Sequence, residues 1–164
     1  MISDQELARL AVRVGRHLLG TARWATTAES CTGGWIAKAL TDIAGSSQWF
    51  AEGFVTYSNE AKFRRLGVPR PVLKAEGAVS QAVARAMASG ALLRSGAQVA
   101  VAVTGIAGPG GAVPGKPVGT VWLAWAVRGG RGIEVTTELK HFKGDRDAVR
   151  RKTVRTAMAG ILRR

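Results

Sequence analysis

The stretch QVAVAV, residues 98–103, decides the fold that we expect for this chain. It is uncharged and almost entirely apolar, with β-branched valines, which is typical of a central strand buried on both faces. Shorter runs at residues 24–28 and 52–57 also have the character of strands, and helical patterns separate the three runs. Strands that alternate with helices predict an α/β domain.

Helix signals surround these strands. Ser3 and Glu6 have the spacing of a capping box, and Gly20 ends the helix that they begin. The prolines of residues 69–71 predict a loop. Gly90 is expected to be a weak point within a later helix, because glycine destabilises helix interiors. Further helices are expected at residues 35–43, 59–66, 81–94 and 146–164.

The last two strands are expected to form a hairpin. Residues 118–127 and 133–142 have strand character and flank the glycine-rich turn of residues 129–132. This order of elements predicts a three-layer α/β domain with a mixed sheet. Because no repeat or linker divides the chain, we expect a single domain over residues 1–164.

The composition is strongly basic. The chain of 164 residues has 24 Lys and Arg against 11 Asp and Glu, a formal net charge of +13. This excess favours an anionic partner: nucleic acid, a membrane surface or a phosphorylated small molecule. A single cysteine excludes an internal disulfide framework. The acidic N-terminus does not resemble a signal peptide, and glycine and proline interrupt the low-charge residues 95–113, so we expect a cytoplasmic protein with no membrane partner.

The segment AESCTGG, residues 28–34, joins a predicted strand to a predicted helix. A hydroxyl at this point, such as that of Ser30, can act as a nucleophile beside the free N–H groups of the helix. Glu29, Cys31 and Lys62 together have the residue types of a Glu/Lys/Cys amidase, which is a rival mechanism. A helix cap without chemistry explains the segment equally well.

The segment TYSNEAK, residues 56–62, follows the next predicted strand. If Tyr57 closes that strand and Lys62 lies one turn into the helix, both can face one crevice. A lysine there can be a general base when burial or nearby cations lower its pKa, and the tyrosine can relay a proton or hold the lysine. A surface lysine on an exposed helix face is the simpler alternative.

A glycine-rich loop, TGIAGPGG at residues 104–111, follows the most apolar strand and can approach a ligand closely. Its glycine spacing is not that of the dinucleotide fingerprint. Residues 110–116 match the spacing of a phosphate loop, but Pro117 stands where that motif requires Ser or Thr. We therefore interpret the loop as part of a site without either motif.

The last predicted helix begins with a cluster of charges. Arg146 in its first turn can bind a carboxylate or a phosphate. The basic residues that follow it, Arg150 among them, are expected on a solvated face. His17 and His141 lack the spacing of metal ligands, so no metal is expected.

At these segments the sequence resembles the nicotinamide-nucleotide amidohydrolase family, the CinA C-terminal domain. The similar segments follow one another in order over nearly the whole chain. They are AESCTGG at residues 28–34, GSS at 45–47, GFVTYSNEAK at 53–62, GAVS at 77–80, TGIAGPG at 104–110, KPVGTV at 116–121 and GDRDAVR at 144–150. The chain looks like the free-standing form, without the molybdopterin-binding-like domain of longer members.

The resemblance implies hydrolysis of the carboxamide of nicotinamide mononucleotide, a phosphorylated pyridine nucleotide, to nicotinic acid mononucleotide and ammonia. It implies no metal or organic cofactor, and a three-layer α/β/α sandwich with a mixed, mostly parallel sheet. It makes Ser30 the nucleophile and adds Tyr57 and Lys62 to the catalytic group. The residues that we expect to bind substrate are Thr32, Gly33, Gly34, Asn59, Thr104, Gly105, Gly108 and Arg146.

Three alternatives stay open at this point. Cys31 can replace Ser30 as nucleophile in the same reaction. The chain can instead be a basic nucleic-acid-binding module without catalysis, although no nucleic-acid motif accompanies its basic residues. It can also keep the fold without activity. Nucleic acid is not the partner we expect, and a homo-oligomer is compatible with the sequence.

Overall fold

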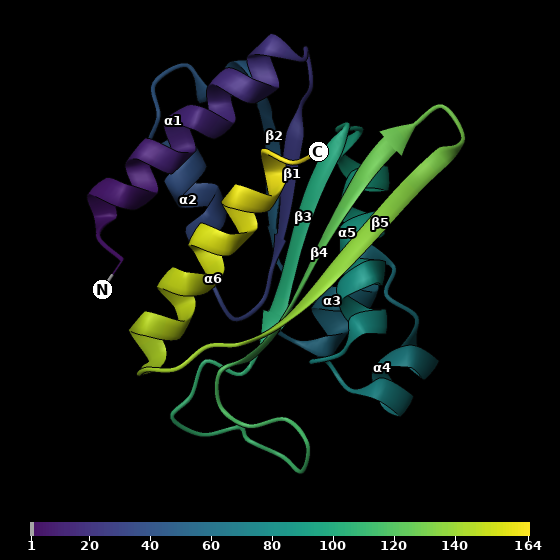
Figure 1. Cartoon of the computed structure of the whole chain (residues 1–164). Helices are drawn as coiled ribbons and strands as arrows, with labels where there is room; N and C mark the ends of the chain where they lie inside the picture. The colour runs from purple at the N-terminus through teal and green to yellow at the C-terminus, as the bar shows by residue number, and fades with distance from the viewer. Residues whose placement is uncertain (1) are drawn as a thin grey trace.

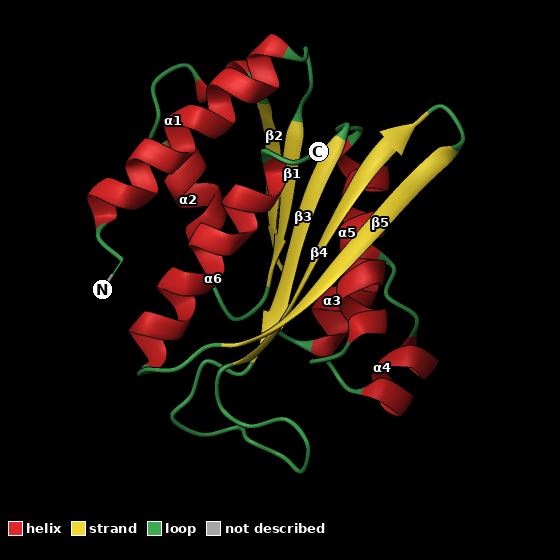
Figure 2. Ribbon diagram, viewed as in Figure 1, coloured by secondary structure: helices red, strands yellow, loops and turns green. Residues whose placement is uncertain are grey.

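A five-stranded mixed sheet runs through the middle of the molecule, with helices on both faces (Figures 1 and 2). The computed structural model describes residues 2–164. The strands are β1 (Ala25–Glu29), β2 (Phe50–Val55), β3 (Val99–Gly105), β4 (Thr120–Gly129) and β5 (Gly132–His141). The helices are α1 (Asp4–Gly20), α2 (Trp35–Thr41), the short 3₁₀ helix η1 (Ser46–Gln48), α3 (Asn59–Leu66), α4 (Arg70–Glu76), α5 (Gln81–Ser95) and α6 (Arg146–Ile161).

The order of the strands is β2-β1-β3-β4-β5. The pairs β1–β2 and β1–β3 are parallel, whereas β4 is antiparallel to both β3 and β5, so four of the five strands point the same way. This arrangement confirms the predicted three-layer α/β fold with a mixed, mostly parallel sheet. The hairpin of β4 and β5 is also confirmed.

Alternation along the central strands determines how closely each helix layer approaches the sheet. The valines of β3 pack in one core cluster with α1, α2 and α6, while its alanines Ala100 and Ala102 pack in another with α5. Strand β4 repeats the pattern, with Leu123 and Trp125 on the first face and small Ala124 on the second. Small side chains toward α5 let that helix lie close to the sheet.

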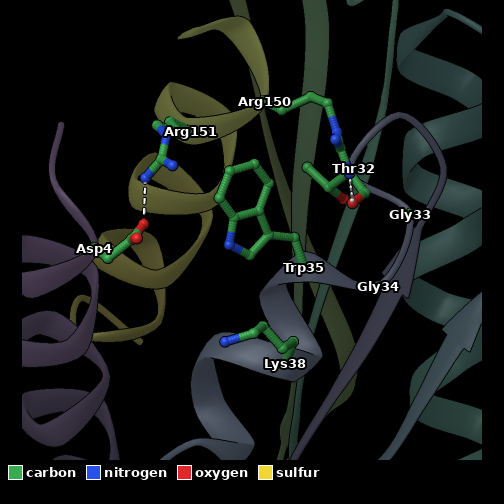
Figure 3. A pocket seen from close by; sticks show the side chains of 8 residues that line it. All are labelled: Asp4, Thr32, Gly33, Gly34, Trp35, Lys38, Arg150 and Arg151. Carbon is green, nitrogen blue, oxygen red and sulfur yellow. Dashed lines mark hydrogen bonds and ion pairs between the residues drawn. The ribbon is translucent and has the colours of Figure 1, made fainter. Parts of the chain in front are cut away.

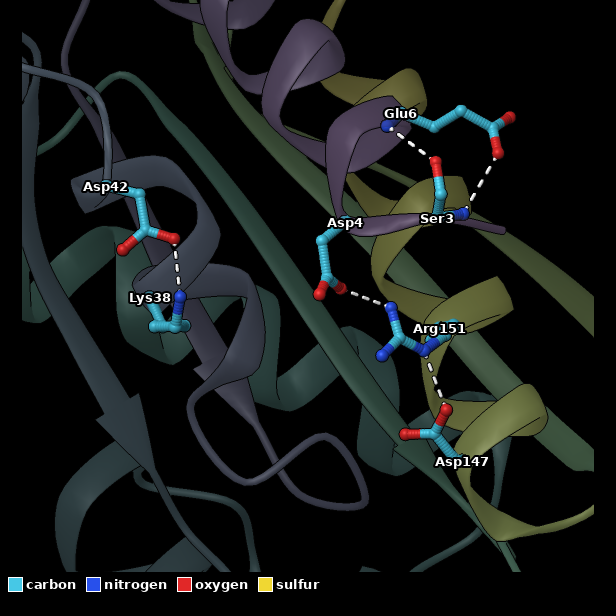
Figure 4. Close-up of polar contacts among 7 residues, drawn as sticks. All are labelled: Ser3, Asp4, Glu6, Lys38, Asp42, Asp147 and Arg151. Atoms are coloured by element: carbon cyan, nitrogen blue, oxygen red, sulfur yellow. Dashed lines mark hydrogen bonds and ion pairs between the residues drawn. The ribbon is translucent and has the colours of Figure 1, made fainter. Parts of the chain in front are cut away.

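Helix α1 begins as predicted. The Ser3 hydroxyl accepts a hydrogen bond from the Glu6 amide, and the Glu6 carboxylate accepts one from the Ser3 amide, which completes the capping box (Figure 4). Helices α3, α5 and α6 begin within one residue of their predicted starts, each with a side-chain cap at the preceding residue. Local capping chemistry was therefore a reliable signal in this chain.

Two predictions along the chain were wrong. The residues expected to form a loop around the two prolines form helix α4, with Pro71 in its first turn. A proline is accepted there because the first helical N–H groups have no partner within the helix. Strand β2 ends at Val55, two residues earlier than expected, so Tyr57 lies beyond the strand.

Gly90 is a point of close packing rather than a weak point. A Cβ atom added to Gly90 in α5 would lie 1.9 Å from the carbonyl oxygen of Leu66, the last residue of α3. Only glycine lets the two helix backbones approach so closely. Gly90 therefore helps to place α3, and with it Lys62.

The strand register places three polar segments at one edge of the sheet. Glu29 of β1 pairs with Val55 of β2 and with Val103 of β3. The chain leaves each strand just beyond these residues. Residues 28–34, residues 56–62 and the glycine-rich loop of residues 104–111 therefore meet at the carboxyl ends of the parallel strands. Carboxyl ends of strands are the usual place for a site in α/β folds. No helix within residues 2–164 is long and apolar enough to cross a membrane.

Candidate active site

Ser30 lies directly after β1, in a tight turn that leads into α2. Its amide donates to the carbonyl of Val103 over 3.1 Å, which fixes its backbone to the central strand. The turn closes when the Gly33 amide donates to the Ser30 carbonyl over 3.0 Å. Gly33 and Gly34 have φ angles of +61° and +95°, which other residues adopt only with strain. The two glycines thus let Ser30 stand at a sharp strand-to-helix bend.

Lys62 reaches Ser30 from helix α3. Its Nζ lies 3.1 Å from the Ser30 Oγ and donates to the Thr56 carbonyl over 2.7 Å. The side chain is only 1% exposed, so the expectation of a plain surface lysine is wrong. Burial removes the ammonium group from water and lowers the pKa of Lys62 from 10.5 to about 8. A neutral amine is therefore accessible near physiological pH, within reach of a hydroxyl.

Cys31 follows Ser30 but points into the core. It is 5% exposed and belongs to the core cluster under α1, α2 and α6. Burial, together with the nearby Glu29 carboxylate, raises the pKa of the Cys31 thiol to about 12. A thiol that stays protonated and buried is a poor nucleophile.

Glu29 has a role that the sequence did not suggest. Its carboxylate is fully buried and accepts four hydrogen bonds at the start of α2. The donors are the Thr32 hydroxyl at 2.6 Å and the amides of Gly34, Ile36 and Ala37 at 3.1, 3.0 and 2.8 Å. These contacts satisfy N–H groups at the helix start and hold the turn after Ser30. The carboxylate is therefore engaged in structure and does not face Lys62.

Two amides of the turn donate to no oxygen within residues 2–164: that of Cys31, which lies beside its own thiol, and that of Thr32. The amides of Ser30, Gly33 and Gly34 are all engaged, as described above. The free N–H of the residue after a nucleophile is the usual oxyanion donor at a strand-to-helix bend. The Gly33 and Gly34 amides, which were expected to contact substrate, are thus engaged within the turn itself.

Arg146 connects two further segments of the site. From the first turn of α6 it donates to the Gly108 carbonyl over 2.7 Å and to the Tyr57 hydroxyl over 3.0 Å. Tyr57 is 62% exposed, and its hydroxyl bonds Arg146 rather than Lys62. The structure thus brings Tyr57, Gly108 and Arg146 together, beside the pair of Ser30 and Lys62.

The other predicted substrate-binding residues have varied surroundings. Thr104 is buried, and its hydroxyl donates to the Ala78 carbonyl over 2.8 Å. Gly105 lies against β4, where a Cβ atom would come within 2.8 Å of the Thr120 carbonyl oxygen. Asn59 is the exposed first residue of α3. Thr104 and Gly105 are therefore needed at least for packing at this edge.

Arg150 is a site residue that sequence reasoning missed. It was expected on a solvated face, yet it is half-buried, and its guanidinium group donates two hydrogen bonds to the turn after Ser30. Its Nε donates to the Cys31 carbonyl over 3.2 Å, and its Nη2 donates to the Thr32 carbonyl over 2.9 Å. Its spacing of four residues from Arg146 places both arginines on one face of α6, and that spacing was the available signal.

A cavity of about 390 Å³ lies on the α6 side of the same turn (Figure 3). Trp35 forms its floor, with the guanidinium groups of Arg150 and Arg151 5.1 and 4.9 Å from the indole ring. Among residues 2–164, no group of three or more His, Cys, Asp or Glu side chains is placed to hold a metal ion.

Comparison of the sequence and the fold with known proteins identifies relatives of this chain. The model of a family described as the CinA C-terminal domain matches residues 7–164. A relative from Pseudomonas putida named nicotinamide-nucleotide amidohydrolase PncC is 55% identical over 156 residues, 95% of each chain. A protein of the same name from Escherichia coli (strain K12) is 53% identical over 157 residues, 96% of this chain and 93% of that one. The crystal structure of competence/damage inducible protein CihA from Agrobacterium tumefaciens has a TM-score of 0.91 and 46% identity, covering 100% of this chain and 98% of the other.

Proposed function

The chain belongs to the CinA C-terminal domain family, and from this premise we propose that it is a nicotinamide-nucleotide amidohydrolase. The proposed reaction converts the carboxamide of nicotinamide mononucleotide to a carboxylate and releases ammonia. The names of relatives more than half identical in sequence support the substrate class. The observation that carries the proposal is the contact of 3.1 Å between the buried Lys62 amine and the Ser30 hydroxyl.

In the proposed mechanism, neutral Lys62 takes the proton of Ser30 as the hydroxyl oxygen attacks the amide carbon. The pyridinium ring withdraws electrons and makes that carbon more electrophilic. The tetrahedral intermediate then collapses, the C–N bond breaks, and Lys62 returns the proton to the leaving ammonia. Water, deprotonated by the same amine, hydrolyses the acyl-enzyme and restores Ser30. The depressed pKa of Lys62, about 8, supports this exchange of one proton in both directions.

The free amides of Cys31 and Thr32 are the proposed oxyanion donors. Both lie in the turn that carries Ser30, and neither donates to an oxygen within residues 2–164. Preorganised N–H groups of this kind each contribute roughly 2.7–4 kcal/mol to transition-state stabilisation.

Tyr57 and Arg146 are proposed to act on the substrate rather than on Lys62. Tyr57 is exposed beside the site and offers a flat surface to the pyridinium ring. Arg146 uses two of its five N–H donors on Gly108 and Tyr57, so others remain for a phosphate. We propose Asn59, Thr104, Gly105 and Gly108 as the remaining substrate-side residues.

The alternative with Cys31 as nucleophile has less support. Its thiol is buried in the core with a pKa of about 12, and Glu29 is engaged by four donors at the start of α2. Ser30 by contrast is partly exposed and contacts the amine.

The test is a matched pair of neighbouring variants, Ser30→Ala and Cys31→Ala, assayed for ammonia release from nicotinamide mononucleotide. Ser30→Ala is expected to lower kcat by at least about 10³-fold, because it removes the attacking oxygen. Cys31→Ala is expected to keep kcat within about tenfold, because the thiol only fills the core. Activity that survives in Ser30→Ala and disappears in a folded Cys31→Ala would make the cysteine the nucleophile. A wild-type protein that releases no ammonia would exclude the proposed substrate.

A further inference from the structure

The carbonyl groups of the turn after Ser30 are held from two different directions. The Ser30 carbonyl accepts from the Gly33 amide, a contact within the turn itself. The carbonyls of Cys31 and Thr32 accept from Arg150, which lies more than a hundred residues further along the chain on α6. One side chain from another element therefore fixes two successive peptide groups beside the nucleophile.

Because the peptide group is planar, the hydrogen bond from Arg150 to the Cys31 carbonyl also fixes the direction of the Thr32 N–H. In a trans peptide the C=O and the following N–H point in opposite directions. The Cys31 carbonyl points toward Arg150 and α6, so the N–H of Thr32 points away from α6. Lys62, which contacts the Ser30 Oγ, comes from the helix layer on the opposite face of the sheet. The Thr32 N–H thus points away from α6, within the buried part of the turn and toward the layer from which Lys62 comes.

The two free amides differ in what orients them. The Cys31 N–H shares its peptide group with the Ser30 carbonyl and is oriented by the turn. The Thr32 N–H shares its peptide group with the Cys31 carbonyl and is oriented by Arg150. Removal of Arg150 therefore affects one oxyanion donor selectively.

We propose that Arg150 is a positioning residue that aligns the Thr32 amide as the second oxyanion donor of the amidase. This inference rests on the proposed function and deepens it. Arg150 does not touch the substrate; it acts through the turn. Trp35 supports the guanidinium from one side, 5.1 Å away, which keeps the group in place (Figure 3).

Arg151 provides a matched control. It is the next residue on α6 and lies 4.9 Å from the same indole ring, but its hydrogen bonds go to Asp4 and Asp147 (Figure 4). Arg151→Met therefore removes a neighbouring cation from the same surface and leaves the turn untouched. Arg150→Met removes both hydrogen bonds to the turn. Arg150→Lys keeps the positive charge but has a single nitrogen in place of the two that bind the carbonyls.

The experiment measures kcat and KM for nicotinamide mononucleotide in the three variants and, in parallel, the rate of Ser30 acylation by p-nitrophenyl acetate. Loss of one oxyanion donor lowers kcat by 10²–10³-fold in general. Arg150→Met is expected to lower kcat, and the acylation rate, by about 10²-fold, with KM within about threefold.

Arg150→Lys is expected to lie between Arg150→Met and wild type. Arg151→Met is expected to stay within about threefold of wild type in kcat and KM. In a fourth variant, Arg150→Ala, added methylguanidinium is expected to restore part of the rate, because it can replace the missing guanidinium group.

Thermal unfolding shows that each variant is folded at the assay temperature, and Arg150→Lys replaces Arg150→Met if the latter unfolds. A folded Arg150→Met with kcat within threefold of wild type would overturn the proposal. So would a raised KM at unchanged kcat, because Arg150 would then be a substrate contact. If wild type is acylated at Ser30 but does not hydrolyse the nucleotide, the proposed substrate fails while the acylation rates still test Arg150. If Ser30 is not acylated by either compound, both proposals are wrong.

Discussion

At the scale of single residues, Lys62 is almost completely buried, and its proposed role as general base requires the amine to be neutral. With a pKa of about 8, about a tenth of the Lys62 side chains are neutral at pH 7, against roughly one in three thousand at the ordinary value of 10.5. The same burial that produces this fraction costs stability, because the folded state resists protonation of Lys62. Active sites often carry such a cost.

The stability cost of Lys62 is expected to depend on pH in a defined direction. Its pKa is lower in the folded state than in the unfolded chain, so below about pH 8 the full penalty applies. The penalty fades as the pH rises toward 10.5, where the unfolded chain also loses the proton. The difference between 10.5 and about 8 corresponds to about 3 kcal/mol. Lys62→Met carries no such penalty. The free energy of unfolding of Lys62→Met minus that of wild type should therefore be about 2–3 kcal/mol smaller at pH 10 than at pH 7.

Urea unfolding of both proteins at pH 7, 8, 9 and 10 measures this difference. The variant also loses the hydrogen bond to the Thr56 carbonyl, whose dependence on the charge of Lys62 is already contained in the pKa of about 8. A difference that stays constant with pH would mean that Lys62 has an ordinary pKa in the folded protein. Lys62→Met is also expected to have almost no amidase activity.

At the scale of elements, the site depends on helices that stand on opposite faces of the sheet. Helix α3 brings Lys62 from one face, and α6 brings Arg146 and Arg150 from the other. Helix α3 packs mainly against α5, whereas α6 packs against α1, α2 and the sheet, so each is positioned by its own packing. For α3 the decisive contact is the one between Leu66 and Gly90 of α5.

A methyl group at Gly90 is expected to displace α3. An alanine usually stabilises a helix interior by roughly 1 kcal/mol relative to glycine. At this position its Cβ would lie 1.9 Å from a backbone oxygen, so Gly90→Ala should instead destabilise the protein by about 2–4 kcal/mol and lower kcat through Lys62. Chemical unfolding and the ammonia assay measure the two effects.

Gly20→Ala is the control for this prediction. Gly20 is also a helical glycine, at the end of α1, and a Cβ atom there meets nothing within 4 Å. It should change stability by less than about 1 kcal/mol and leave kcat unchanged. A Gly90→Ala protein as stable and as active as Gly20→Ala would show that α5 and α3 separate easily.

At the scale of the whole molecule, the net charge of +13 comes mostly from basic residues other than Lys62, Arg146 and Arg150 of the site. Three of them, Arg9, Arg13 and Arg16, lie exposed on α1, and others pair with acids, such as Arg151 with Asp147. Charges more than about 8 Å apart are largely screened at physiological salt. Only the arginines at the site itself therefore contribute strongly to binding of a small anion.

The proposed function and the nucleic-acid alternative differ in their response to salt. Binding to duplex DNA through six or more phosphate contacts would weaken by roughly 10³-fold or more between 50 and 200 mM salt. For a nucleotide amidase with one phosphate in its substrate, we expect kcat to be unchanged and kcat/KM to fall by less than about threefold over the same range. Steady-state kinetics and a DNA-binding titration in the same buffers measure both. Micromolar affinity for DNA that persists at 200 mM salt would favour the binding module.

Local sequence patterns predicted all five strands, every α-helix except α4, and most of the residues that meet at the site. Caps such as Ser3 and Asp145, and the alternation of Val and Ala in β3, are encoded within a few residues, so local patterns along the chain were enough to predict them. The order of strands and helices then brought the segments after β1, β2 and β3 to one edge, as parallel strands require.

The protonation state and the hydrogen-bond partners of these residues depend on contacts between distant segments. Burial of Lys62, and with it the pKa of about 8, results from packing of α3 against distant elements. The partner of Tyr57 is Arg146, 89 positions away, and Arg150 reaches the turn after Ser30 over a separation of more than a hundred. Desolvation and hydrogen bonds depend on distance in space, whereas local patterns report only neighbours along the chain. That is why Arg146 could be expected at the site from the sequence, but its hydrogen bond to Tyr57 and the contacts of Arg150 with the turn could not.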